Sequence, residues 1–199
     1  NIEKPVIFEQ EFEMRIIKNL RKDQETILRF LDVFGGGSAA LGASSKHAQP
    51  GFFIFANTFI HEYIEEGFFR KEELLMKTLE NCGFPPDEGA IGAMRNEQKK
   101  SRDAAKHLLK AATDWQAGDE SGRVEVGWAA SEYTSTLRQN LNRLKNLVFP
   151  LLEQNISPEE EQNIAEGLDN IVFDGSMKNE PDKYNKLIET LEDELSDWK

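Results

Sequence analysis

Cysteine is almost absent from this sequence, which contains one cysteine in 199 residues. A single cysteine cannot form an internal disulfide, so the chain is not a disulfide-stapled scaffold and suits a reducing compartment. We therefore expect a cytoplasmic protein. Cys82 stands at the end of an expected helix, where we assign it a half-buried packing role.

Long apolar runs and a signal-like start are missing as well. No stretch approaches the roughly 20 consecutive apolar residues that a membrane-spanning helix needs. The first ten residues, NIEKPVIFEQ, contain neither a methionine nor the apolar core of a secretory signal. We expect no membrane segment, and a chain that begins at a processed or truncated N-terminus.

Basic residues are outnumbered, because 24 lysines and arginines face 36 aspartates and glutamates, for a formal net charge of −12. Such a surface repels the phosphates of nucleic acids and anionic lipid headgroups. We expect neither nucleic acid nor a membrane surface as a partner. The length and a hydrophobic content of 39% suffice for a single domain with its own core.

The alternation of apolar and polar residues that marks β-strands is also missing, and apolar residues instead recur every three or four positions. This period predicts helices over residues 12–34, 52–81, 90–117 and 124–154. The segment GGGSAALGASSKHAQPG, residues 35–51, predicts a flexible loop. Gly83 is expected to cap the second helix, and Pro150 to kink the fourth.

Two shorter helices are expected after these. The segment SPEEEQ offers Ser157 as an N-cap and Pro158 at the first helical position. A strongly acidic helix should cover residues 181–198. Four long helices joined by loops predict an all-α protein, an antiparallel up-down four-helix bundle over about residues 8–154 with a C-terminal helical extension over 157–198, within one domain spanning 1–199.

Several polar residues fall on the predicted inward faces of these helices, where Leu28 and Leu109 also count as inward. Glu72 lies between Phe68 and Leu75 on the apolar stripe of its helix. A buried carboxylate without partners is costly, so Glu72 should be protonated, or paired and hydrogen-bonded. Arg102, together with the neighbouring amides, is the expected partner. The candidate interior polar residues are Gln24, Glu72, Gln98, Arg102 and Asn140; alternatively, some of them lie on a solvated flank.

The segment KEELLMKTLENCGFPPDEGAIGAMRNEQKKSR resembles the middle of the hemerythrin-like (HHE cation-binding) domain family. There, a helix with a His-x-x-x-Glu pair runs into a leucine-rich turn, and a Gly-x-Pro loop leads to a Gly-x-Ile-x-x-Met helix start. An acidic-His pair follows, with an arginine four residues after the histidine. LRKDQETIL is similar to the family's first helix, YTSTLRQNLNRLKNLVFPLLEQNISPEEEQ to its last bundle helix, and DKYNKLIETLEDEL to its tail. The resemblance covers nearly the whole chain and implies the hemerythrin-like bundle.

The same resemblance implies that the metal-binding histidines of the family have been replaced. Carried over position by position, the histidines of the first three helices fall on Gln24, Phe68 and Gln98, and the His-Glu pair of the fourth falls on Asn140 and Leu144. Glu72 alone persists. Amides are weak ligands and apolar side chains are none, so we expect no metal and no di-iron cofactor. The candidate interior pocket comprises Gln24, Phe68, Glu72, Gln98, Arg102, Asn140 and Leu144.

One further grouping could hold a metal. His61 and Glu65 are four residues apart, one heptad before Phe68 and Glu72, so His61, Glu65 and Glu72 form an alternative site. The matching positions of the other helices offer no good ligand. His61 is more simply interpreted as a partly exposed histidine beside acidic neighbours, and His107 as a surface residue.

These observations favour a non-enzymatic hemerythrin-like protein with a degenerate metal site, which binds, senses or interacts with a small ligand or a protein partner. Arg102 would suit an anionic group. The alternative is an iron-binding hemerythrin-like protein in oxygen or iron sensing, storage or redox protection, in which Glu72 acts with carboxylates such as Glu65 and Glu97. A third interpretation is a repacked, purely structural core without a cavity.

Overall fold

The computed structural model describes residues 13–42, 46–174 and 182–198, and the regular secondary structure of these residues is entirely helical. The all-α prediction is confirmed. No helix in the described ranges is long and apolar enough to cross a membrane. The helices are α1 (Arg15–Gly42), α2 (Pro50–Phe59), η1 (Ile60–Phe68), α3 (Phe69–Asn81), α4 (Gly89–Gln116), α5 (Ser121–Arg143), η2 (Leu144–Val148), α6 (Phe149–Asn155), α7 (Pro158–Asp174) and α8 (Lys183–Asp197). η1 and η2 are π-helices that continue their neighbours without a break.

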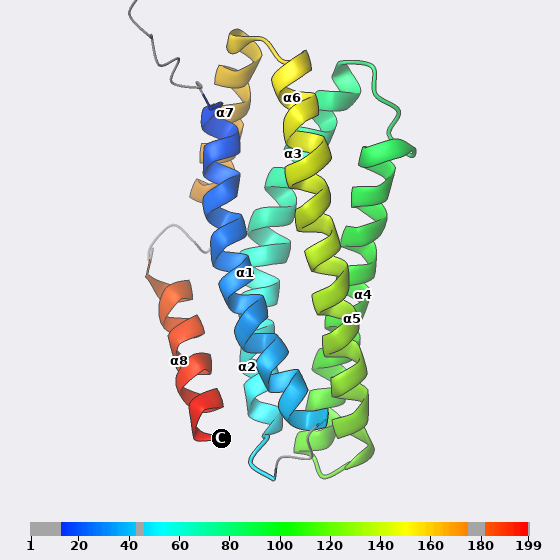
Figure 1. Cartoon of the computed structure of the whole chain (residues 1–199), viewed down its shortest axis with the longest axis vertical. Coiled ribbons are helices and arrows are strands. Elements are labelled where there is room, and N and C mark those ends of the chain that lie inside the picture. Colours follow the sequence, from blue (N-terminus) through cyan, green and yellow to red (C-terminus); the bar gives the residue numbers. More distant parts are fainter. Residues whose placement is uncertain (1–12, 43–45, 175–181, 199) are drawn as a thin grey trace, which may run out of the picture.

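The long helices α1 and α4 and the continuous rods α2–η1–α3 and α5–η2–α6 lie side by side (Figure 1). α4 packs against α5 and α2, and α1 packs against α5. α7 covers α1 and α3, whereas α8 covers α1 and α2. Gly83 and Gly118, with φ of 96° and 105°, end α3 and α4 in the left-handed conformation that glycine adopts readily. The predicted cap at Gly83 is thus confirmed. After these turns, α4 runs back along the rod α2–η1–α3, and α5 runs back along α4.

The first helix extends beyond the predicted boundary, so the expected loop over residues 35–51 is wrong for residues 35–42. Packing overrides the low helix propensity of the glycine run. A Cβ atom on Gly37 would lie 2.4 Å from Phe52 Cε1, and one on Gly36 would lie 2.7 Å from Leu195 Cδ2. These glycines let α2 and α8 approach the helix closely. The run of small residues is evident in the sequence, but in the structure these residues allow close contact between helices and do not form a loop.

The other predicted helices agree closely with the structure. η2 ends two residues before Pro150, whose missing N–H and bulky ring interrupt the normal helical ladder. Ser157 Oγ accepts from the Glu160 amide at 3.3 Å, and Glu160 Oε2 accepts from the Ser157 amide at 2.8 Å, which completes a capping box. The expected helix starts at Phe12 and Pro181 lie outside the described residues.

Two leucines predicted to face inward do not. Leu28 and Leu109 are 39% and 38% exposed, whereas their neighbours Ile27 and Leu108 are fully buried. Adjacent helical residues point about 100° apart, and here Ile27 and Leu108 face the core while Leu28 and Leu109 lie at the edge of the buried face. The predicted stripes were too wide by one residue.

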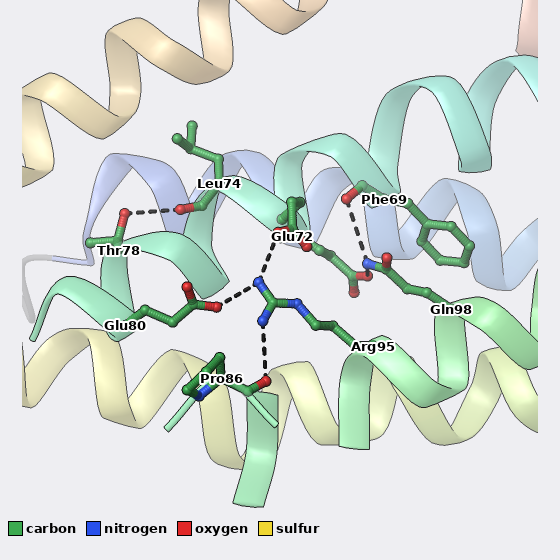
Figure 2. A network of polar contacts seen from close by, with 9 residues as sticks. Phe69, Glu72, Leu74, Thr78, Glu80, Pro86, Arg95 and Gln98 are labelled. Carbon is green, nitrogen blue, oxygen red and sulfur yellow. Dashed lines mark hydrogen bonds and ion pairs between the residues drawn. The ribbon is translucent and has the colours of Figure 1, made fainter. Parts of the chain in front are cut away.

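Arg95 fixes the connection between α3 and α4. Its Nη2 donates to Glu73 Oε1 at 2.8 Å and forms an ion pair with Glu80 Oε1 at 2.5 Å, while Nη1 donates to the Pro86 carbonyl at 3.1 Å (Figure 2). Arg95 lies one turn before Gln98 on α4. This network therefore sets the position of Gln98 against α3.

Candidate functional site

Glu72 lies in the first turn of α3, directly after η1, and has no exposed surface. Its Oε2 accepts hydrogen bonds from Gln98 Nε2 of α4 at 2.7 Å and from Asn140 Nδ2 of α5 at 3.4 Å. Gln98 Nε2 also lies 3.5 Å from the Phe69 carbonyl oxygen (Figure 2). Three helices thus meet at one carboxyl group. We refer to Glu72, Gln98 and Asn140 as the carboxyl–amide cluster.

Burial favours the neutral form of the Glu72 carboxyl. Burial raises the pKa of Glu72 to about 8, while the hydrogen bonds from Gln98 and Asn140 oppose this rise. The charge of Glu97 raises the pKa further and that of Arg102 lowers it. At pH 7 Glu72 is therefore mostly protonated, as the sequence allowed, and its carboxyl can both donate and accept.

Arg102 does not pair with Glu72, contrary to expectation. Its guanidinium lies over the Phe69 ring, 5.1 Å from the centroid, and the side chain is half-buried on the flank of α4. Arg102 acts on Glu72 only through the field of its charge, without a hydrogen bond. A neutral carboxyl needs no cationic partner. The Arg102 guanidinium instead contacts solvent and the face of the Phe69 ring.

Glu97, which was a candidate ligand in the iron-binding alternative, is already engaged. Arg143 donates from Nε to Glu97 Oε1 at 3.0 Å and from Nη2 to the same oxygen at 2.9 Å. Glu97 is only 5% exposed, so this pair satisfies a buried charge. It joins α4 to α5 beside the cluster.

The remaining residues of the predicted pocket are buried, but they do not bond to the cluster. Gln24 Nε2 donates to the Leu141 carbonyl at 3.1 Å and so ties α1 to α5. Phe68 and Leu144 are 1% and 0% exposed. Of the seven predicted residues, the structure therefore brings Glu72, Gln98 and Asn140 into direct contact, packs three others in the core and places Arg102 on the flank.

Both π-helices meet the positions that the resemblance assigns to metal ligands. η1 ends at Phe68 and η2 begins at Leu144. A π-helix is rare and is found mostly at functional sites, because an extra residue in a turn redirects the side chains around it. Apolar spacing does not distinguish π from α turns over so short a span, and only Pro150, close after η2, marks a local disruption in the sequence.

His61 and Glu65 come together on η1, with His61 Nδ1 at 3.3 Å from Glu65 Oε2. The His61 side chain is 60% exposed, so the interpretation as a partly exposed histidine beside an acid is confirmed. His107 also lies at the surface, as expected, 2.9 Å from Glu125. Among residues 13–42, 46–174 and 182–198, no three His, Cys, Asp or Glu side chains gather into a group that could hold a metal ion, and this includes His61, Glu65 and Glu72.

The donor chemistry of the cluster does not fit a di-iron centre. Iron and zinc sites in proteins are built from imidazoles, thiolates and ionised carboxylates. The cluster offers one carboxyl that burial keeps neutral, together with two amides that donate to it. We therefore derive no chemistry through a metal at this position.

Sequence reasoning missed a second buried polar group, centred on Asp23 of α1. Lys71 Nζ donates to Asp23 Oδ2 at 2.6 Å and to Asn19 Oδ1 at 3.2 Å, and Tyr63 OH donates to Asp23 Oδ1 at 3.0 Å. Burial raises the pKa of Tyr63, so its hydroxyl remains a donor. Asp23 and Lys71 directly precede Gln24 and Glu72, where helical spacing alone suggests a solvated flank. Their burial results from the packing of α1 against the rod α2–η1–α3, which only the structure shows.

Surface hollows lie away from the cluster. One of about 680 Å³ is lined by Glu13, Arg21, Glu153 and Glu161, near the starts of α1 and α7. Three others lie between α1 and α7, at the α4–α5 turn and between α1 and α5. None of these four is lined by Glu72, Gln98 or Asn140.

No protein-family model, curated protein or solved structure matches this chain. The function is therefore inferred from the chemistry of the site and from the resemblance described above.

Proposed function

We propose that this protein is a metal-free member of the hemerythrin-like family, an antiparallel up-down four-helix bundle that works as a non-enzymatic binding, sensing or interaction module. The chemistry at the positions assigned to metal ligands carries this proposal. Two of them, Gln98 and Asn140, are amides that donate to Glu72, and two others, Phe68 and Leu144, are buried apolar residues. In this account, a proton on Glu72 takes the place of the metal.

The π-helix η1 supports an origin in a metal site. An apolar core packs well on regular α-helices, so the buried Phe68 by itself gives no reason for π geometry. Ligand side chains must be aimed at a shared ion, and an extra residue in the turn achieves this. We interpret η1 as geometry retained from a site whose ligands have since changed, whereas Pro150 accounts for η2.

The absence of an assigned catalytic role follows from the same residues. Glu72, Gln98 and Asn140 include no nucleophile, and each is at most 4% exposed. A general base must be ionised and must reach its substrate. The Glu72 carboxyl is neutral and enclosed, so it meets neither requirement. The cluster is suited to holding a proton and a defined packing, which a binding partner or a change of conditions can then disturb.

Elemental analysis tests this function. The protein is purified after expression in iron-supplemented medium, and its metal content and ultraviolet–visible spectrum are recorded. We expect iron far below one equivalent and no absorption beyond that of the aromatic side chains. Near-stoichiometric iron with oxo-bridge absorption would support the iron-binding alternative and contradict the proposal.

A further inference from the structure

Two buried hydroxyl groups extend the carboxyl–amide cluster along the interior. Ser101 Oγ and Tyr133 OH are buried without a hydrogen-bond partner, as are Glu72 Oε1 and Asn140 Oδ1. All four side chains have no exposed surface. Buried polar groups are nearly always hydrogen-bonded, to the protein or to an internal water molecule, because an unpaired group loses the whole of its hydration.

These atoms lie along one direction of the interior. Ser101 follows Gln98 by three residues on α4, and Tyr133 precedes Asn140 by seven residues on α5, so each shares the face of its partner in the cluster. α4 and α5 run in opposite directions, so both steps lead the same way (Figure 1). At the rise of an α-helix, the step to Tyr133 covers about 10 Å.

The direction leads to the surface at η1. Glu65 precedes Glu72 by seven residues on the rod α2–η1–α3. Its negative charge contributes to the raised pKa of Tyr133. The Glu65 side chain is 19% exposed and its partner His61 is 60% exposed. The Glu65–His61 pair is therefore the candidate solvent end of this series.

We propose that Glu72, Asn140, Ser101 and Tyr133 line a hydrated path along the interior, through which Glu72 exchanges its proton with solvent at the Glu65–His61 pair. The ligand of this site is water, which can donate to Asn140 Oδ1 and can both donate to and accept from the two hydroxyls. When Glu72 releases its proton to the adjacent water, a proton passes from the Glu65–His61 end to a solvent base. The reverse sequence reprotonates Glu72.

Charged groups beside the path are few. Glu97 and Arg102, both on α4, act on Glu72, and Glu65 on η1 acts on Tyr133. α1 contributes Gln24, whose amide donates to the Leu141 carbonyl. The proposed path consists of Glu72, Asn140, Ser101 and Tyr133 and does not depend on the family assignment. Evidence against the path and a positive iron analysis are therefore separate results.

Carboxyl NMR tests the path directly. With ¹³C-labelled glutamate, the Glu72 resonance is assigned from its loss in Glu72→Gln, and its proton exchange rate is measured near the midpoint of its titration. We expect Tyr133→Phe and Ser101→Ala to slow the exchange about tenfold, the change for a barrier raised by roughly one hydrogen bond. Tyr63→Phe is the matched control, because its hydroxyl is bonded to Asp23 outside the path, and it should leave the exchange rate unchanged.

Exchange at the wild-type rate in both path variants, or equal slowing in Tyr63→Phe, would overturn the proposal. Urea unfolding gives a second readout. A hydroxyl bonded to internal water contributes to stability, so Tyr133→Phe should raise the unfolding equilibrium constant about fivefold. A dry, unpartnered hydroxyl predicts an equal or lower constant, and that result would also contradict the path. If Tyr133→Phe fails to fold, Ser101→Ala provides the same two measurements.

Discussion

A single carboxyl on α3, that of Glu72, accepts buried hydrogen bonds from both α4 and α5. Glu72 is buried among amides and held neutral, so the centre of a protein with a net charge of −12 carries no charge at this point. Its inward position follows from helical spacing, which the sequence shows. Its hydrogen-bond partners depend on the relative heights of α3, α4 and α5, which spacing within one helix does not determine. The sequence therefore predicted Gln98 and Asn140 as interior residues and assigned the pairing to Arg102 and the neighbouring amides, of which only the amides bond to Glu72.

The pKa of Glu72 makes stability depend on pH in a defined direction. The value is about 8 in the folded protein against an ordinary 4.5, so the folded state holds this proton more tightly than the unfolded state. The contribution is fully present below pH 4.5 and is lost as the pH rises toward about 8. Over this range Glu72 should lower the free energy of unfolding by about 4 to 5 kcal/mol, taking 1.36 kcal/mol per pH unit.

Glu72→Gln removes this titration. We expect the free energy of unfolding of the variant to fall less steeply than that of the wild type, measured by urea unfolding at intervals between about pH 5 and 8. The difference between the two proteins isolates Glu72, since all other titrating groups are shared. Parallel curves would show that Glu72 has the same pKa in both states.

The Asp23–Lys71 pair provides a second prediction at this scale. Lys71→Met leaves the Asp23 carboxylate buried without its cation, and this should cost about 3 to 5 kcal/mol in denaturant unfolding. Replacing both residues, as in Asp23→Leu with Lys71→Met, should recover most of this loss because no unpaired charge remains. The exposed Lys110–Asp114 pair is the control, and Lys110→Met should change stability little. A double variant no more stable than Lys71→Met would contradict this interpretation.

At the scale of helices, propensity and packing disagree in the second half of α1. A run of glycine, serine and alanine is typical of a loop, and propensity alone supports that interpretation. The helix continues because Phe52 and Leu195 pack where Gly37 and Gly36 have no side chains. Such contacts join segments far apart in the chain, so no local pattern reveals them. The π-helices were missed because apolar spacing does not distinguish π from α turns over a short span.

Two glycines of α1 distinguish packing from propensity. Gly37→Ala would place Cβ 2.4 Å from Phe52 Cε1, so we expect a loss of about 1 to 3 kcal/mol despite the better helix propensity of alanine. A Cβ atom on Gly35 would meet no atom within 4 Å, and Gly35→Ala should therefore stabilise the protein by about 0.5 to 1 kcal/mol. Thermal or urea unfolding gives both values. Equal stabilisation by both substitutions would mean that α1 and α2 do not pack closely at Gly37.

At the scale of the whole molecule, the sequence predicted the all-helical class and most helix boundaries, because long apolar periodicities are its strongest signal. It did not predict where the last two helices pack. α8 is fixed by Arg29 Nη2 donating to Glu192 Oε2 at 2.6 Å, by Lys183 Nζ donating to Glu62 Oε2 at 2.5 Å, and by the Trp198 ring at 4.9 Å from that of Phe52. Each of these contacts joins residues more than 100 positions apart, so no local sequence pattern reveals them.

The central claim is that a protonated carboxyl–amide cluster stands where the proposed hemerythrin-like assignment would place a metal. An anaerobic Fe(II) titration tests it most directly, comparing the wild type with a variant that restores the implied ligands: Gln24→His, Phe68→His, Gln98→His, Asn140→His and Leu144→Glu. We predict no stoichiometric binding to the wild type and binding to the folded variant, with oxo-bridge absorption after exposure to air. Stoichiometric iron in the wild type would contradict the account, and a folded variant that binds none would contradict the assigned ligand positions.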